Sequence, residues 1–159
     1  MSLDQREFRD ALGEFATGVT VVTAKDKDGT PVGATANSFS SVSLDPPLVL
    51  WNVAKTANCF DAFNAAEHFA IHILHRGQED ISKRFATRDA DKFSGVEWSE
   101  NSNGTPLLAD FDVRFECSTE HLYDGGDHLI IVGRVHAMDN KAREPLGFYK
   151  GKYAKIVTD

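Results

Sequence analysis

The last third of the chain holds two long strand patterns separated by one tight turn, and this pair constrains the fold more than any other feature. The patterns cover Val113–Leu122 and His128–Met138, where β-branched and other apolar residues are frequent. Between them lies Asp124-Gly125-Gly126-Asp127, a polar, glycine-rich turn that strongly favours a β-hairpin. The chain is therefore expected to contain antiparallel β structure around this hairpin.

Shorter elements are predicted along the rest of the chain. Strands are predicted where β-branched and apolar residues cluster, at Thr20–Thr23, Val32–Ala36, Leu48–Trp51 and Phe69–Leu74, with a shorter one near Val96–Trp98. Helices are predicted where apolar residues recur at helical spacing, at Asp4–Ala16, Thr56–Ala66 and Gln78–Ala86. Residues 37–43 are expected to be a polar stretch, residues 87–105 to be rich in loops, and the tail Pro145–Val157 to be short and aromatic.

The order of these elements predicts the fold class. Strands and helices do not alternate regularly, as they would in a doubly wound parallel sheet. No repeat or linker divides the 159 residues, a length that suits one domain with a core of its own. We therefore expect a single, mainly β domain over residues 1–159, an antiparallel barrel with a few helices packed on its outside.

The composition limits the classes of partner. The net charge is −7 and the sequence pI is about 5.3, whereas a surface that follows DNA or RNA needs clustered Lys and Arg. No apolar run approaches the roughly 20 residues that cross a bilayer. The polar start at Met1–Arg6 shows no signal peptide, and the isolated Cys59 and Cys117 suit buried thiols in a reduced compartment. We expect a cytoplasmic protein with no nucleic-acid and no membrane partner.

Several familiar catalytic motifs are missing from the sequence. It contains no Gly-x-Gly-x-x-Gly of a Rossmann site, no phosphate-binding P-loop and no Gly-x-Ser-x-Gly nucleophile elbow. His68, His72 and His75 lie close in sequence, but strand alternation would turn His72 away from its apolar neighbours and leave His75 at the strand end. The three imidazoles are therefore not expected to share a metal ion.

The segment Thr35–Ser41 is the first candidate for a ligand site. It places hydroxyls, an amide and small side chains at the end of a predicted strand. Such groups can hydrogen-bond the polar edge of a flat ligand, and a flavin ring combines a polar edge with apolar faces. The alternative is a Ser- and Thr-rich strand end that satisfies its own backbone.

Six further residues could complete such a site. Lys55 and Thr56 begin a predicted helix, where unpaired N–H groups favour anions such as a flavin phosphate. Arg84 and Phe85 could add charge and a ring edge, with surface exposure and packing as their alternatives. His128, where the hairpin turn enters its second strand, could contact a nicotinamide, and Tyr153 could close the pocket; otherwise they are a loop histidine and a packed terminal aromatic.

The residues just described resemble those of a known family. The blocks Phe15–Thr23 and Gly33–Leu48, then Gly126-Asp127-His128 and the late Pro145–Tyr153, follow the order found in the flavin reductase-like, FMN-binding split-barrel family. The similarity covers essentially the whole chain. It implies a Greek-key-like split β-barrel that forms a homodimer, with flavin held near the subunit interface.

The resemblance also implies an activity. Family members typically reduce FMN or FAD with NADH or NADPH, and many supply reduced flavin to a partner monooxygenase. Carried over by position, the residues expected to line the flavin ring are Thr35, Ala36, Asn37 and Ser38. The ribityl chain and phosphate would be bound by Ser40, Ser41, Lys55 and Thr56, with Arg84 and Phe85 nearby. Trp51, where members often carry a smaller residue, is included in the flavin site, and His128 would face the nicotinamide beside Tyr153.

Three other functions remain open at this point. The same barrel could be a flavin-binding electron-transfer protein that does not use NADH. It could use bound flavin to reduce another acceptor, such as a metal chelate or a corrinoid. It could also bind a different flat heteroaromatic molecule through Thr35–Ser41 without redox chemistry.

Overall fold

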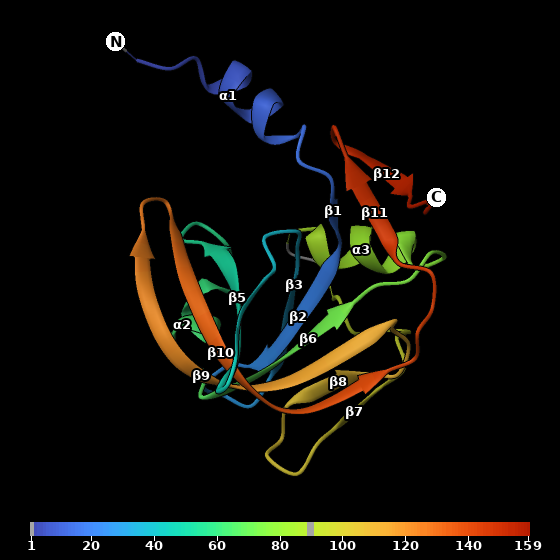
Figure 1. Ribbon diagram of the computed structural model, residues 1–159. Helices are drawn as coiled ribbons and strands as arrows, with labels where there is room; N and C mark the ends of the chain where they lie inside the picture. Colours follow the sequence, from blue (N-terminus) through green and yellow to red (C-terminus); the bar gives the residue numbers. More distant parts are fainter. Residues whose placement is uncertain (1, 89–90) are drawn as a thin grey trace.

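The main body of the protein is a strongly curved antiparallel sheet (Figure 1). The computed structural model describes residues 2–88 and 91–159. Seven strands pair in the order β3-β2-β6-β9-β10-β5-β4. Their bounds are β2 Thr20–Lys25, β3 Pro31–Ala36, β4 Ser40–Leu44, β5 Pro47–Ala54, β6 His68–Ile73, β9 Val113–Gly125 and β10 His128–Asn140. Among the described residues no pairing joins the edge strands β3 and β4, so the predicted antiparallel barrel is split along this line.

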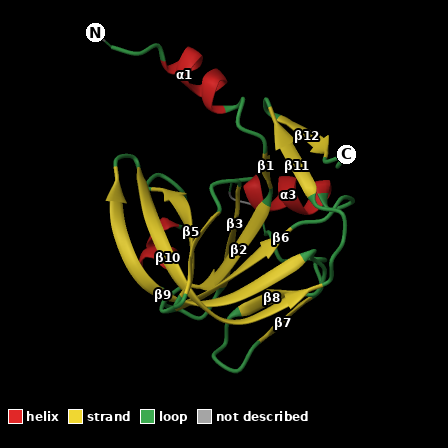
Figure 2. Cartoon of the chain, in the orientation of Figure 1, coloured by secondary structure: helices red, strands yellow, loops and turns green. Residues whose placement is uncertain are grey.

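Two small sheets and three helices surround the main sheet (Figure 2). One small sheet contains β1 Thr17–Gly18, β11 Leu146–Tyr149 and β12 Lys152–Lys155, and the other contains β7 Trp98–Glu100 and β8 Pro106–Leu108. The helices are α1 Gln5–Leu12, α2 Phe60–Ala65 and α3 Glu79–Ala86. Within residues 2–88 and 91–159, none of them has the length and hydrophobicity of a membrane span.

The predicted hairpin is confirmed and extends further than the sequence indicated. Strands β9 and β10 have 13 residues each and pair antiparallel from Val113↔Asn140 to Gly125↔His128. Irregularities between Val132 and Gly133 and between Val135 and Ala137 interrupt the register. Because bulges bend a strand and increase its twist, they let the long hairpin follow the curved sheet.

Strand β4 was not predicted, because its sequence lacks the usual strand signal. Residues 40–44 read Ser-Ser-Val-Ser-Leu, and all of them except the half-buried Ser43 are exposed. The strand forms at the edge of the sheet by pairing with β5, and its register shifts between Ser41 and Ser43. An edge strand with little buried surface owes its conformation to its neighbour rather than to its own apolar pattern.

Two predicted helices are longer than the observed ones. The first begins after Asp4, whose carboxylate accepts a hydrogen bond from the Glu7 N–H at 3.0 Å, but it ends at Leu12 rather than Ala16. The second starts at Phe60 instead of Thr56, because two successive turns from Ala54 to Phe60 come first. The third helix agrees with its prediction within one residue.

The main core packs between the seven-stranded sheet and α2. Its largest side chains are Trp51, Phe63 and Phe69, each 1% exposed, and the Trp51 ring meets the Phe63 ring edge to face at 4.7 Å between centroids. Gly133 is required here, because an added Cβ would lie 2.5 Å from the Phe69 ring. Cys59 and Cys117 are free and buried, as predicted, and burial raises the pKa of Cys117 to about 12.

His72 connects the main sheet to β8. Its side chain is fully buried; Nε2 accepts a hydrogen bond from the Leu108 N–H at 3.0 Å, and Nδ1 lies 3.0 Å from the Val21 carbonyl oxygen. An imidazole that accepts at Nε2 carries its proton on Nδ1, so Nδ1 donates to Val21. Burial lowers the pKa of His72 to about 3, so this histidine is a neutral structural link.

Candidate functional site

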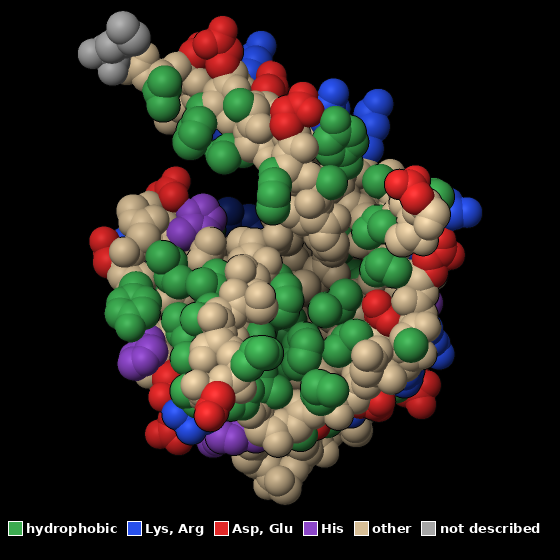
Figure 3. Space-filling view, viewed as in Figure 1, with side chains coloured by type: hydrophobic (Ala, Val, Ile, Leu, Met, Phe, Trp, Pro, Cys, Tyr) green, Lys and Arg blue, Asp and Glu red, His purple; other side chains and the backbone are tan. Residues whose placement is uncertain are grey.

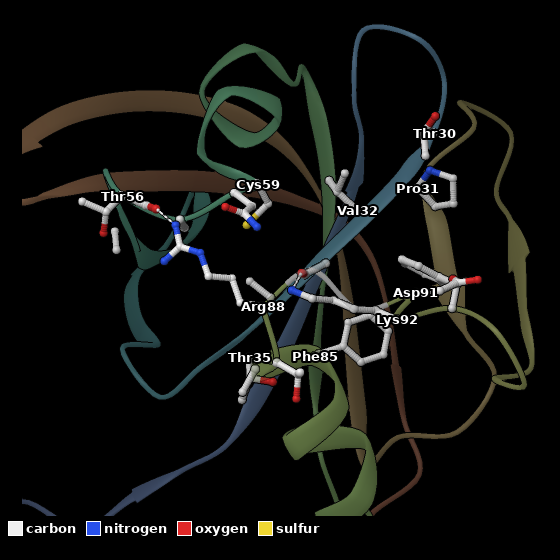
Figure 4. A pocket seen from close by; sticks show the side chains of 18 residues that line it. Thr30, Pro31, Val32, Thr35, Thr56, Cys59, Phe85, Arg88, Asp91 and Lys92 are labelled. Atoms are coloured by element: carbon white, nitrogen blue, oxygen red, sulfur yellow. Dashed lines mark hydrogen bonds between the residues drawn. The ribbon is translucent and has the colours of Figure 1, made fainter.

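A pocket of about 790 Å³ opens where the edge strand β3, the turn after β5 and the end of α3 meet (Figure 4). Its walls combine backbone, hydroxyl, aromatic and cationic groups. The residues that the argument below uses are Gly33, Thr35, Thr56, Phe85, Arg88 and Lys92.

The β3 wall offers unpaired backbone groups. Strand β3 pairs with β2 on one side only, so its other edge faces the pocket. The Gly33 carbonyl accepts a hydrogen bond from Lys92 and therefore points to this open edge. In an antiparallel strand the N–H and C=O of one residue point to the same side, and residues two apart share that side. The backbone amides of Gly33 and Thr35 therefore both face the pocket.

Two cations lie on the opposite wall. The Lys92 ammonium donates to the Gly33 carbonyl at 2.9 Å, and the Arg88 guanidinium donates to the Thr56 carbonyl at 2.9 Å (Figure 4). Among the described residues neither forms an ion pair with a carboxylate, and burial lowers the pKa of Lys92. Within residues 2–88 and 91–159 the hydrogen bonds given for these two cations go to neutral carbonyls, which leave a cation most of its capacity to bind an anion.

Aromatic rings close the inner end of the pocket. The Phe85 side chain is 1% exposed and packs directly on β3, because Gly33 has no side chain to keep it away. Phe93 meets the Phe85 ring edge to face at 5.1 Å between centroids. The pocket thus has an apolar end, a hydrogen-bonding edge and a cationic rim.

Of the predicted site residues, Thr35, Thr56 and Phe85 line this pocket. The argument that placed Thr56 at a helix N-terminus is wrong, since α2 begins at Phe60. Thr56 instead lies in the turn after β5, and its carbonyl binds Arg88.

Thr35 and Tyr153 meet on one residue of α3. The Thr35 hydroxyl donates to the Ser82 carbonyl at 2.6 Å, and the Tyr153 hydroxyl donates to the Ser82 hydroxyl at 2.8 Å. Ser82 is 2% exposed and was not recognised from the sequence. These bonds fix α3 against β3 and β12, so in this structure both hydroxyls position the wall of the pocket.

Lys55 and His128 lie together at the tip of the hairpin. The Lys55 N–H donates to the Asp127 carbonyl at 2.9 Å, and its side chain pairs with Asp124. His128 Nδ1 lies 2.7 Å from an Asp127 carboxylate oxygen, a hydrogen bond that lowers the pKa of Asp127. His128 is also the cross-strand partner of Ala54, a residue that lines the pocket. The hairpin tip therefore adjoins the pocket.

The polar segment after Thr35 does not line the pocket. Part of it agrees with the alternative interpretation, a polar strand end whose side chains satisfy backbone groups. Ser38 satisfies backbone groups of β5: its hydroxyl accepts from the Asn52 N–H at 3.0 Å and donates to the Asn52 carbonyl at 3.3 Å. Ala36 packs against the main core. The exposed residues of this segment are Asn37, Ser40 and Ser41, and within the described chain the Asn37 side-chain amide has no hydrogen-bond partner.

Two predicted residues lie away from the pocket. Trp51 points into the core and is 1% exposed, so its inclusion in the flavin site is not supported: its ring fills the space between Phe63 and Phe69. Arg84 donates to the Ser94 carbonyl and does not line the pocket, whereas Arg88, which follows the end of α3, does.

Arg88 and Lys92 were missed because they follow α3 in a segment predicted only as loop. Hydrogen bonds to backbone carbonyls hold both side chains at the pocket. Arg88 donates to Thr56, 32 residues away in sequence, and Lys92 donates to Gly33, 59 residues away. The available signal was a pair of basic residues four apart directly after a helix.

The three neighbouring histidines do not converge. His72 is bound to Val21 and Leu108, His75 Nε2 lies 2.9 Å from Asp110, and His68 pairs across β6 and β9 with Ser118. Within residues 2–88 and 91–159, no group of three His, Cys, Asp or Glu residues is arranged to hold a metal ion.

Comparison with known proteins agrees with this architecture. The family model that matches residues 12–157 describes a flavin reductase like domain. Over 150 residues the chain is 49% identical to the stachydrine N-demethylase reductase subunit Stc3 of Rhizobium meliloti, covering 94% of this chain and 65% of Stc3. It is 47% identical to the FMN reductase (NADH) SmoA of Agrobacterium fabrum, covering 96% of this chain and 87% of SmoA.

The fold has solved counterparts as well. The structure of the NADH:FAD oxidoreductase SgcE6 from Streptomyces globisporus, in complex with NAD and FAD fragments, matches with a TM-score of 0.91 and 39% identity over 100% of this chain and 99% of that chain. By contrast, the chain spans 48% of the length of another Rhizobium meliloti relative that is 47% identical. Since the family model covers residues 12–157 and the folds superpose, this chain belongs to the flavin reductase like family.

Proposed function

We propose that this protein is an NAD(P)H-dependent flavin reductase that passes hydride from a reduced nicotinamide to FMN or FAD. The observation that carries the proposal is the pocket beside β3, where open backbone amides, two cations and an aromatic wall converge. A flavin nucleotide needs these three features, because it has a polar ring edge, apolar ring faces and a phosphate. The names of SmoA and SgcE6 support the same chemistry.

Each wall of the pocket has a part in binding. The amides of Gly33 and Thr35 would hydrogen-bond the polar edge of the ring, and the exposed Asn37 amide would extend this edge beyond the pocket. Arg88 and Lys92 would bind the phosphate. A bound flavin supplies the electron chemistry, while the protein supplies binding, orientation and electrostatics. Thr35 and Tyr153 act indirectly, by holding α3 through Ser82.

His128 would position the nicotinamide. An ionised carboxylate only accepts hydrogen bonds, so in a neutral imidazole the contact with Asp127 places the proton on Nδ1 and leaves Nε2 as an acceptor. That nitrogen can accept a hydrogen bond from an amide group such as a carboxamide. The adjacent Ala54 brings this position to the mouth of the pocket.

The proposal extends to the assembly and the setting of the protein. We propose a homodimer, supported by large apolar side chains that one subunit leaves exposed, Phe8, Phe15 and Leu44 among them. A partner monooxygenase that receives the reduced flavin is supported by relatives that are named reductase components of flavin-dependent monooxygenases. Two free, buried thiols support a reducing compartment such as the cytoplasm.

Anaerobic titration tests the proposal directly. The purified protein is mixed with FMN or FAD, and its visible spectrum is followed while NADH or NADPH is added. We expect flavin binding and loss of the oxidised flavin spectrum far faster than with free flavin. Flavin binding without faster NADH oxidation would indicate an electron-transfer protein instead. No flavin binding at all would point to another heteroaromatic ligand, and a screen of metal chelates and corrinoids would reveal a different acceptor.

A further inference from the structure

The tip of the β9–β10 hairpin buries little surface of its own. Residues 121–127 are all exposed, and within the described chain residues 121–125 of β9 pair with β10 alone. Figure 1 shows the tip at the upper left, at the margin of the sheet, and in Figure 3 acidic and histidine side chains lie over it. A segment with so few buried contacts opens easily unless other bonds fix it.

Lys55, in the turn after β5, supplies two such bonds. Its backbone N–H donates to the Asp127 carbonyl at 2.9 Å, and its ammonium forms an ion pair with Asp124. Asp124 belongs to β9, whereas Asp127 directly precedes β10, so one residue ties the end of β5 to both sides of the hairpin. The hydrogen bond from Lys55 lowers the pKa of Asp124, so this carboxylate stays ionised at neutral pH.

The same turn also reaches the flavin pocket. The Thr56 carbonyl accepts a hydrogen bond from Arg88 at 2.9 Å, and Ala54 lines the pocket and is the cross-strand partner of His128. Three successive residues, from Ala54 to Thr56, therefore connect the pocket wall with the hairpin tip. A movement of the tip relative to this turn would carry His128 away from the mouth of the pocket.

The Lys55 ammonium is not placed to bind a flavin phosphate. Lys55 does not line the pocket, and its charge is compensated by Asp124. By contrast, Arg88 and Lys92 line the pocket and donate to neutral carbonyls. The resemblance of the sequence implied a phosphate contact for Lys55, but its contacts in the structure favour a different role.

We propose that Lys55 is a positioning residue for hydride transfer, which holds the hairpin tip so that His128 stays at the mouth of the pocket. The inference rests on the proposed flavin reductase function, in which His128 orients the nicotinamide. Lys55 acts through Asp127, whose carbonyl it binds and whose carboxylate oxygen lies 2.7 Å from His128 Nδ1. Its charge also compensates one of the two carboxylates at the tip, which would otherwise repel an anionic dinucleotide.

Flavin titration and stopped-flow reduction of Lys55→Met separate the two roles. The substitution removes the ammonium and keeps the stem and the backbone N–H. FMN affinity should stay within about twofold of wild type, while hydride transfer from NADH should slow roughly two- to fivefold, as expected of one exposed ion pair. Lys55→Arg, which can keep the pair with Asp124, should retain the wild-type rate. Lys150→Met, which removes an exposed ion pair with Glu14, is the matched control and should change neither value.

A double-variant cycle shows whether Lys55 acts through His128. Adding Lys55→Met to His128→Ala should slow hydride transfer no further, because the residue that Lys55 positions is already absent. A general structural loss would instead add to the effect of His128→Ala. The exchanged pair, Lys55→Glu with Asp124→Lys, should recover much of the rate lost in Lys55→Met, since the ion pair can form in the reverse direction.

Amide hydrogen exchange measures the tip without any flavin chemistry. Residues 121–128 should exchange faster in Lys55→Met than in wild type or Lys150→Met, because the tip opens more often. Unchanged exchange, additive losses in the double variant, or a loss of FMN affinity without a loss of riboflavin affinity would overturn this inference alone and leave the flavin chemistry standing. A wild type that does not oxidise NADH with flavin present would remove the proposed function and this role with it, whatever the exchange at the tip.

Discussion

The Lys92 ammonium donates a hydrogen bond to the Gly33 carbonyl at 2.9 Å, which joins the loop after α3 to the open edge of β3. This contact connects two segments of the pocket wall that lie 59 residues apart in sequence. It also holds a cation beside the amides proposed to bind the flavin ring. The contact therefore connects two parts of the pocket wall and also places a positive charge in the pocket.

Replacing Lys92 should weaken binding of the flavin phosphate. Lys92→Met keeps most of the side-chain stem and removes the charge. Since a hydrogen bond to a charged group contributes about 1.5–3 kcal/mol, FMN affinity should fall at least about tenfold. Fluorescence titration measures this change. Riboflavin, which lacks the phosphate, should bind both proteins alike, and Lys27→Met in the exposed turn after β2 serves as the control. An equal loss of FMN and riboflavin affinity would mean that Lys92 only shapes the pocket.

Asn37→Ala should lower the affinity for both FMN and riboflavin. The Asn37 side chain is exposed just beyond the pocket, and its proposed contact is with the ring, which both ligands share. Loss of one neutral hydrogen bond of about 1 kcal/mol corresponds to a roughly fivefold weaker complex. Ser40→Ala is the matched control, because its hydroxyl already donates to the Ser41 carbonyl. Unchanged riboflavin binding in Asn37→Ala would remove this residue from the site.

His128→Ala should slow hydride transfer without weakening flavin binding. Its role is to orient the nicotinamide, and loss of one orienting hydrogen bond of about 1.5 kcal/mol corresponds to a roughly tenfold slower step. Anaerobic stopped-flow mixing of the flavin-loaded protein with NADH measures the step directly. His121→Ala, further along the same hairpin and stacked on Tyr123, is the control. An NADH oxidation rate equal to that of the wild type would refute the role of His128.

His72 should make folding stability depend on pH in acid. Its pKa is about 3 in the folded protein and near 6.5 in the unfolded chain, so between these values the unfolded chain binds one proton more. The free energy of unfolding should therefore fall by about 1.4 kcal/mol for each unit that the pH drops below 6.5, as far as about pH 3. Urea unfolding at several pH values measures this slope.

The variant His72→Gln identifies the source of that slope. The substitution should lower the free energy of unfolding by about 1–3 kcal/mol at neutral pH, because the Leu108 N–H and the Val21 carbonyl lose well-placed partners. It should also remove the contribution of one proton from the pH dependence of that free energy. The exposed His121→Gln should leave the slope as in wild type. A His72→Gln protein that keeps the full slope would contradict the assignment.

Gly33→Ala should destabilise the fold through Phe85. An added Cβ would lie 2.6 Å from two ring carbons of Phe85, and overpacking of this kind costs about 1–3 kcal/mol. The melting temperature should fall accordingly. Phe85→Leu, which shortens the opposing side chain, should recover part of the loss when combined with Gly33→Ala. Additive losses in the double variant would show that the two positions do not interact.

The sequence by itself determined the mainly antiparallel fold, most clearly through the β9–β10 hairpin and the strands β2, β3, β5 and β6. These elements have local causes: glycine in the turn and β-branched residues in the strands. The resemblance to the family was also readable along the chain, and the family match confirmed it. Strand β4 and the start of α2 were not readable, because pairing with β5 and the turns after Ala54 decide them.

Only the tertiary structure decided which side chains share the pocket. Ser38 has the residue type expected of a ligand site, but its hydroxyl is used by hydrogen bonds to Asn52. Trp51 was included only by its position in the family, and its ring packs in the core. Arg88 and Lys92 carried no local pattern, and carbonyls distant in sequence bring them to the pocket. Local propensity depends on neighbours along the chain, whereas a binding site depends on which strand edge stays open and which side chains reach it.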